Sequence, residues 1–150
     1  MRFRFIWVGK TRDKSYKTLL DEYLRRLSFF VKCEIVEVKD AEGPTKKDTE
    51  GNRIIEKVNP TSLVCLLDVK GKSIDSHQLA GEVDMWQIRG TREVTFIIGG
   101  SDGVSDTIVQ RADIMLSLSF LTFTHEMARV VLVEQLYRAF TIINGFPYQK

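Results

Sequence analysis

The sequence predicts one α/β domain with a mostly parallel sheet flanked by helices, and three observations support this fold class. Short runs of β-branched and aromatic residues alternate along the chain with stretches in which apolar residues recur at helical spacing. Residues 63–67 are apolar at every position, which is typical of a strand buried on both faces of a parallel sheet. No internal repeat, low-complexity tract or linker divides residues 1–150.

The first part of the chain predicts two strands, each followed by a helix. Residues 2–8 alternate and then become apolar, as in a strand with partly exposed ends. Residues 13–30 carry apolar side chains at helical spacing, and residues 33–38 alternate again as a second strand. Polar residues 39–50 predict a loop, and a short helix is expected over about 47–58.

The middle of the chain adds the buried strand 63–67, a loop at 68–72 and a helix that Gly90 ends. The inner face of this helix is expected to carry Leu79, Val83, Trp86 and Ile88. A strand at 95–98, a short helix ending near residue 112 and a strand at 114–118 follow.

The last helix, from about His125 to Ile143, is apolar around nearly its whole circumference, and Thr124 is its expected N-cap. A domain of this size is not expected to bury every face of such a helix against its own sheet. We therefore expect a homodimer in which this helix packs against a second copy of the chain.

Composition indicates an ordinary globular protein. The chain is 43% hydrophobic and 28% charged, with a formal net charge of +2, which excludes a histone-like polycation. Cys33 and Cys65 lie apart without a CxxC motif, which favours free thiols in a reducing compartment. We expect a cytoplasmic protein with no metal and no membrane partner, because no cluster has metal-ligand spacing, no apolar run approaches the roughly 20 residues of a membrane span, and the N-terminus does not resemble a signal peptide.

Basic residues on the polar face of the 13–30 helix allow two interpretations. Lys14, Lys17, Arg25 and Arg26 lie on this face. They form either a solvated helix surface or, together with Lys10 and Arg12, a patch that contacts phosphates beside a cleft.

The ends of strands 95–98 and 114–118 are the expected ligand site. Glycines at positions 99, 100 and 103 leave room for a ligand to touch the backbone, and adjacent strand ends are where open α/β sheets bind ligands. The pattern is neither GxGxxG nor a P-loop, so a tight strand-to-helix turn explains it equally well.

The same residues resemble the RlmH family, the small SPOUT-class methyltransferases that act on a pseudouridine in large-subunit ribosomal RNA. The resemblance is carried by IIGGSDGV at 97–104, LSLSFLTFTHEMARVVLVEQLYRAF at 116–140 and the terminal PYQK. It extends to VGK at 8–10, EYLRR at 22–26 and LLDVKGK at 66–72, and so covers essentially the whole chain.

The resemblance implies a fold, a cofactor and a substrate. The fold is a SPOUT-type sheet with a C-terminal trefoil knot, and the cofactor is S-adenosyl-L-methionine. The substrate is the N3 atom of a pseudouridine in the helix 69 loop of large-subunit (23S) ribosomal RNA, within the 70S ribosome. By position, the cofactor contacts fall on Leu67, Gly99, Leu118, Ser119, Phe120, Leu121, Thr122 and Phe123.

The resemblance also marks His125, Arg129 and Tyr148 as candidate catalytic residues. His125 is either a structural helix-start histidine or a neutral imidazole that accepts a proton. Arg129 lies one turn on and is expected to face the pocket, where it would hold a phosphate or a uracil carbonyl. Tyr148 is either tail packing or part of the substrate site, reaching across the dimer. Glu134 and Arg138 are spaced for an i,i+4 ion pair.

Two positions depart from the family pattern. The family tail usually ends in Tyr-His, whereas here Gln149 follows the tyrosine, so an essential role for a terminal histidine is in doubt. Thr124 replaces a common proline before the loop histidine. Alternative functions are methylation of another RNA position, a non-catalytic RNA- or ribosome-binding module of the same fold, and a flavodoxin-like nucleotide binder.

Overall fold

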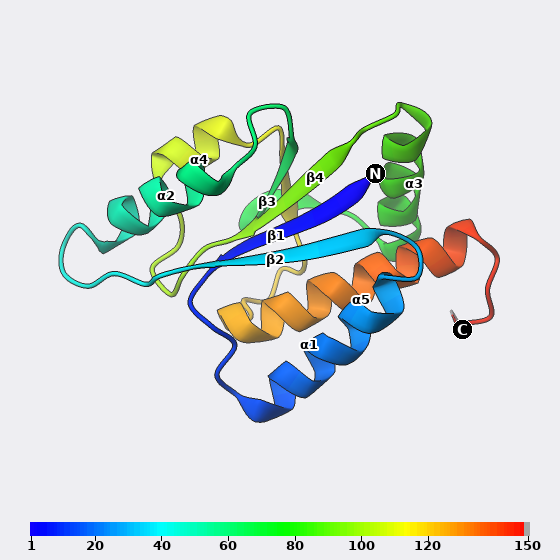
Figure 1. Cartoon of the computed structure of the whole chain (residues 1–150), viewed down its shortest axis with the longest axis horizontal. Coiled ribbons are helices and arrows are strands. Elements are labelled where there is room, and N and C mark those ends of the chain that lie inside the picture. Colours follow the sequence, from blue (N-terminus) through cyan, green and yellow to red (C-terminus); the bar gives the residue numbers. More distant parts are fainter. Residues whose placement is uncertain (149–150) are drawn as a thin grey trace.

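The computed structural model describes residues 1–148 and shows one five-stranded parallel sheet with helices on both faces (Figure 1). The strand order is β2-β1-β4-β3-β5. The strands are β1 (Arg2–Val8), β2 (Lys32–Val38), β3 (Leu63–Ser73), β4 (Glu93–Ile98) and β5 (Ile114–Ser117). The helices are α1 (Lys14–Leu27), α2 (Lys46–Lys57), α3 (Ser76–Ile88), α4 (Asp106–Arg111) and α5 (His125–Ile143).

The sheet separates two hydrophobic cores. Helices α1, α3 and α5 cover one face, and α2 and α4 cover the other (Figure 1). Every residue of the central strand β4 is buried, as a strand covered on both faces requires. The predicted α/β fold class is therefore confirmed. Within residues 1–148, no helix is both long and apolar enough to cross a membrane.

Side-chain caps begin three of the helices. Asp13 accepts hydrogen bonds from the backbone N–H groups of Ser15 and Tyr16, and Asp75 forms a reciprocal capping box with Gln78. Thr124 Oγ1 accepts from Met127 N at 3.3 Å, which confirms the predicted N-cap of α5.

One expected core residue lies outside the core. Leu79, Val83 and Trp86 are buried on α3, but Ile88 is 70% exposed, so its assignment to the inner face was wrong. The reason is geometric, because two residues rotate an α-helix by about 200° and place Ile88 opposite Trp86.

The segment expected to be a loop at 68–72 is instead part of β3. Both Leu67 and Lys72 are in register with Leu116 of β5, so residues 68–71 form a bulge that leaves the sheet and returns to it. A Cβ atom on Gly71 would lie 2.6 Å from the backbone N and C atoms of Leu116. The bulge therefore packs directly against β5. The trefoil knot implied by the resemblance stays a prediction.

Helix α5 is covered more completely than expected. None of its 19 residues is exposed in a single protomer, because α1 and α3 flank it on the sheet (Figure 1). The apolar circumference of α5 is thus largely explained within one chain. The homodimer through this helix stays a prediction.

Candidate functional site

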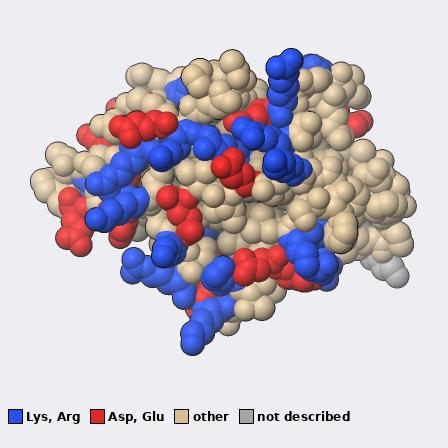
Figure 2. Space-filling model, viewed as in Figure 1, with Lys and Arg blue, Asp and Glu red and all other residues tan. Residues whose placement is uncertain are grey.

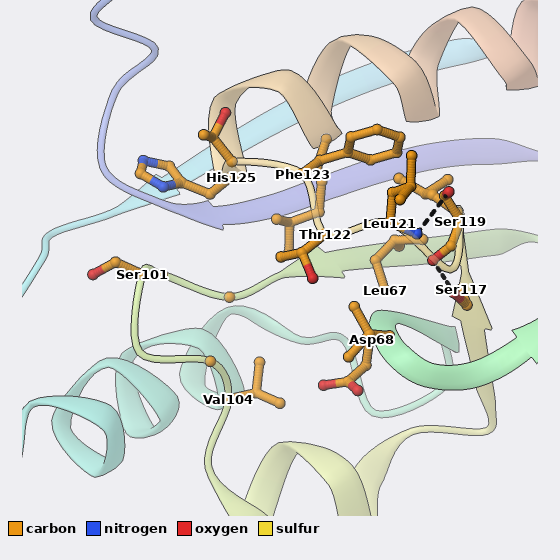
Figure 3. A pocket seen from close by; sticks show the side chains of 18 residues that line it. Leu67, Asp68, Ser101, Val104, Ser117, Ser119, Leu121, Thr122, Phe123 and His125 are labelled. Atoms are coloured by element: carbon orange, nitrogen blue, oxygen red, sulfur yellow. Dashed lines mark hydrogen bonds between the residues drawn. The ribbon is translucent and has the colours of Figure 1, made fainter.

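An apolar cavity of about 590 Å³ lies between the bulge of β3 and the carboxyl ends of β4 and β5. Its wall is built from three segments that are distant in sequence, within residues 67–69, 98–104 and 117–125, together with Ala128 of α5 (Figure 3). This volume lies within the range of pockets that enclose a small organic ligand. The parallel strands bring these three segments together because β4 and β5 end level with Leu67, the residue at which the β3 bulge begins.

Nearly all the residues predicted to contact the cofactor lie on this wall. They are Leu67, Gly99, Leu118, Ser119, Leu121, Thr122 and Phe123. The remaining one, Phe120, is 93% exposed and does not line the cavity. Asp68 and Val69 also line the cavity but were not predicted, because their segment was interpreted as an ordinary loop. The sequence signal that could have indicated their position was Gly71, where the chain packs closely against β5.

Glycines at positions 99, 100 and 103 bring main-chain atoms to the wall. A Cβ atom on Gly99 would lie 2.6 Å from Val104 Cγ1 and 2.9 Å from the carbonyl oxygen of Gly103. Opposite this turn, Ser117 Oγ donates to the Ser119 carbonyl at 2.9 Å, and Leu121 N donates to Ser119 Oγ at 3.0 Å (Figure 3). These bonds hold the loop after β5 in one shape, as a preformed site requires.

A second, polar hollow of about 240 Å³ adjoins the apolar cavity. The two share Gly100, Ser101 and His125 on their walls. The polar hollow is otherwise lined by the loop after β1 and by charged side chains, namely Val8, Gly9, Lys10, Arg12, Asp40, Lys46, Glu50 and Glu126. Two ligands, one in each space, would therefore contact each other beside His125.

His125 lies at the start of α5, beside Ser101 at the edge of the cavity (Figure 3). Burial lowers its pKa from 6.5, and the positive charge of Arg129 lowers the pKa further. The imidazole is therefore mostly neutral at neutral pH and has a nitrogen lone pair that can accept a proton.

Arg129 lines neither space. Its guanidinium is fully buried, donates to Thr11 Oγ1 at 3.0 Å and to the Val8 carbonyl at 2.6 Å, and lies 4.9 Å from the ring centre of Trp7. Burial lowers its pKa to about 10, so it remains a cation. The expectation that it faces the pocket does not match this placement, since four residues rotate the helix by about 40° beyond a full turn, here toward β1.

Tyr148 and His125 lie far apart within one protomer. The Tyr148 hydroxyl donates to Glu134 Oε1 at 2.9 Å, and its ring packs edge-on against Tyr137 with centroids 4.8 Å apart. Glu134 lies nine residues along α5 from His125, an axial distance of about 13 Å. Glu134 also pairs with Arg138 at 2.6 Å, as the spacing predicted. Gln149 lies outside the described residues.

The basic face of α1 is largely neutralised by its own acids. Lys17 pairs with Asp21, while Arg25 and Arg26 both pair with Glu22. Figure 2 shows positive and negative side chains interspersed on the face that carries α1 and β2. A solvated surface is therefore the better interpretation for α1, whereas Lys10 and Arg12 do line the polar hollow.

Across residues 1–148, no group of three or more His, Cys, Asp or Glu side chains is placed to hold a metal ion. Cys33 and Cys65 are free thiols, and burial raises the pKa of each to about 12.

Comparisons with known proteins agree on one family. A family model described as "Predicted SPOUT methyltransferase" matches residues 1–149. Proteins named "Ribosomal RNA large subunit methyltransferase H" from Clostridium botulinum (strain Langeland) and Bacillus pumilus are each 42% identical to this chain, and one from Enterococcus faecalis is 39% identical. Each of these alignments covers 100% of both chains.

Two solved structures share the fold. A probable methylase family protein from Haemophilus influenzae Rd KW20 has a TM-score of 0.59 at 12% identity, over 99% of this chain and 70% of that one. A probable methyltransferase from Bordetella pertussis Tohama I has a TM-score of 0.57 at 14% identity, over 92% of this chain and 95% of that one.

Proposed function

Because the chain belongs to the SPOUT methyltransferase family, we propose that it transfers a methyl group from S-adenosylmethionine to large-subunit ribosomal RNA. The observation that carries this proposal is the apolar cavity between the β3 bulge and the ends of β4 and β5, whose wall includes Leu67, Gly99 and residues 121–123. Full-length relatives named as ribosomal RNA large subunit methyltransferases support the substrate class.

The apolar cavity suits S-adenosylmethionine. The adenine ring and thioether chain need flat apolar walls and a few main-chain hydrogen bonds. The turn from Gly99 to Gly103 packs closely on itself, since a Cβ atom on Gly99 would lie 2.9 Å from the Gly103 carbonyl oxygen, so the wall at Gly99 is formed by main-chain atoms. When bound, the cofactor supplies an electrophilic methyl carbon attached to a sulfonium.

We further propose that the acceptor is N3 of a pseudouridine in the helix 69 loop of the assembled 70S ribosome. The N3–H proton must leave as the N–C bond forms. We propose that His125, whose pKa is lowered by burial and which lines both spaces, accepts that proton. Arg129 acts as a positioning residue, because it fixes the loop after β1 through Val8 and Thr11.

Tyr148 requires a second protomer if it contacts the substrate. In its own chain it is bonded to Glu134, about 13 Å along α5 from His125. We propose that in a homodimer the partner's tail brings this tyrosine to the site, where its ring stacks on or bonds to the target base.

The test is methyl transfer to 70S particles from a strain that lacks the activity, followed by mapping of the modified nucleotide. The proposal predicts transfer to N3 of one pseudouridine in large-subunit RNA. Methylation elsewhere would support a different RNA specificity. Binding of the ribosome without transfer would indicate a non-catalytic module, and indifference to S-adenosylmethionine would contradict the proposal as a whole.

A further inference from the structure

Glu50 is a buried carboxylate whose hydrogen-bonding capacity is mostly unused. Its residue is 3% exposed on α2, and within residues 1–148 no group donates a hydrogen bond to its Oε1 atom. Its Oε2 atom accepts a single long bond, from Ala41 N at 3.4 Å. Burying an anionic oxygen without a donor is costly, so such a group generally has a partner in the functional state of a protein.

The polar hollow is the space that this carboxylate borders. Gly100 separates Glu50 from the apolar cavity, and a Cβ atom there would lie 3.1 Å from Glu50 Oε1. The carboxylate, the glycine turn and His125 therefore surround one small space, which lies beside the apolar cavity.

Glu126 and Lys46, two other charged residues of the hollow, already have hydrogen-bond partners. Glu126 accepts from the backbone N–H groups of Arg12 and Asp13, and Lys46 donates to Ser101 Oγ at 3.1 Å. The side chains of Lys10 and Arg12 form no ion pair with any described residue. The hollow thus offers a carboxylate oxygen that needs an N–H donor, next to cations that suit a phosphate.

We infer that the polar hollow holds the acceptor nucleotide and that Glu50 accepts a hydrogen bond from a ring N–H of its base, with Lys10 and Arg12 facing its phosphate. This inference rests on the proposed function. Pseudouridine has two ring donors, N1–H and N3–H, whereas the N1 atom of uridine carries the ribose. With N3 directed at the methyl donor, N1–H is the donor left for Glu50, which makes Glu50 a residue that selects pseudouridine over uridine.

The ammonium group of S-adenosylmethionine is the other possible source of an N–H donor. The apolar cavity, at about 590 Å³, has room for that cofactor without the polar hollow. The polar hollow, at about 240 Å³, is a suitable size for a second, smaller reactant. With the cofactor in the apolar cavity, a nucleotide in the polar hollow would fill the second space. We therefore assign the polar hollow to the nucleotide.

The test compares Glu50→Gln and Glu50→Met with Glu56→Gln, a control on the exposed side of the same helix. Methionine has a similar volume but no acceptor, and removing an unpartnered buried charge is expected to leave the melting temperature unchanged or raised. We expect both Glu50 variants to bind S-adenosylmethionine within about twofold of wild type. The kcat/KM on pseudouridine-containing ribosomes should fall roughly 10- to 100-fold in Glu50→Met and less in Glu50→Gln, whose amide oxygen still accepts a hydrogen bond, while the control is unchanged.

Base selectivity gives the discriminating readout. Wild type should favour ribosomes with pseudouridine at the target position over ribosomes with uridine by about a hundredfold or more, and Glu50→Met should lose most of that ratio. Unchanged transfer and selectivity in both variants would overturn the inference. A loss of cofactor affinity in step with transfer would also overturn it, because the carboxylate would then serve the cofactor.

A measurement on wild-type protein covers the case in which the variants fail to fold. In the presence of S-adenosylhomocysteine, pseudouridine 5′-monophosphate should bind more tightly than uridine 5′-monophosphate in an NMR titration, and equal binding would contradict the inference. Failure of the proposed function is distinguishable, since wild type would then methylate neither kind of ribosome.

Discussion

Replacing Gly71 by alanine tests the contact that shapes one wall of the apolar cavity. The new methyl group would lie 2.6 Å from the Leu116 backbone N and C atoms and 2.7 Å from the backbone C atom of Met115. All three are backbone atoms of β5, which cannot move aside as a flexible side chain can. The bulge at residues 68–71 must therefore shift outward, and Asp68 and Val69 shift with it.

Overpacking of this kind costs about 1–3 kcal/mol. For a chain of 150 residues, each 1 kcal/mol shifts the melting temperature by roughly 2–4 °C, so Gly71→Ala should lower it by about 2–12 °C. Calorimetric titration should also show weaker S-adenosylmethionine binding, because part of the cavity wall is displaced.

Gly81→Ala is the matched control. Gly81 lies on the exposed face of α3, and a Cβ atom there meets nothing within 4 Å. Alanine is favoured over glycine in a helix by roughly 0.8–1.0 kcal/mol, so this variant should melt slightly higher than wild type with unchanged cofactor affinity. If Gly71→Ala melted as Gly81→Ala does, the close contact between β3 and β5 would be refuted.

Further predictions concern four other residues. Arg129→Ala leaves the acceptors of a fully buried cation unpartnered and should cost about 3 kcal/mol in urea unfolding, with Arg129→Lys intermediate; wild-type stability of both would contradict its positioning role. Because burial lowers the pKa of His125 from 6.5, methyl transfer should fall as acid protonates the imidazole, and His125→Gln should lose this acid limb. The unfolded chain takes up that proton at a higher pH than the folded one, so stability should also decline below pH 6.5, and less so in the variant. Tyr148→Phe loses its bond to Glu134 and should change the free energy of unfolding by no more than about 1 kcal/mol, yet slow methyl transfer at least tenfold; full activity would remove Tyr148 from the substrate site. Burial raises the pKa of Cys65 to about 12, so iodoacetamide should modify this thiol only after unfolding, which mass spectrometry would detect.

Periodicity and capping chemistry were sufficient to predict most of the fold. The apolar run at residues 63–67 marked a buried strand, and Thr124 marked the start of α5, because both signals depend on neighbours within a few residues. Ile88 was assigned to the inner face of α3 wrongly, because its position around the helix axis differs from that of Trp86.

Features set by contacts between distant segments were not predictable in this way. The bulge at residues 68–71 exists because β3 meets β5 twice, which only the assembled sheet reveals. Arg129 has the spacing of a pocket residue, but its guanidinium donates a hydrogen bond to the Val8 carbonyl instead. Glu50 lies in a polar stretch that predicts a loop, and its burial becomes evident only when α2 packs beside Gly100.

The central claim is that the β3 bulge and the loops after β4 and β5 hold S-adenosylmethionine through main-chain atoms in the apolar cavity. A crystal structure of the complex with S-adenosylhomocysteine tests it most directly. We predict that the ligand lies between Leu67, the Gly99–Gly103 turn and residues 118–123, with its sulfur directed toward the polar hollow beside His125. A ligand bound elsewhere, or no binding at millimolar concentration, would contradict the claim.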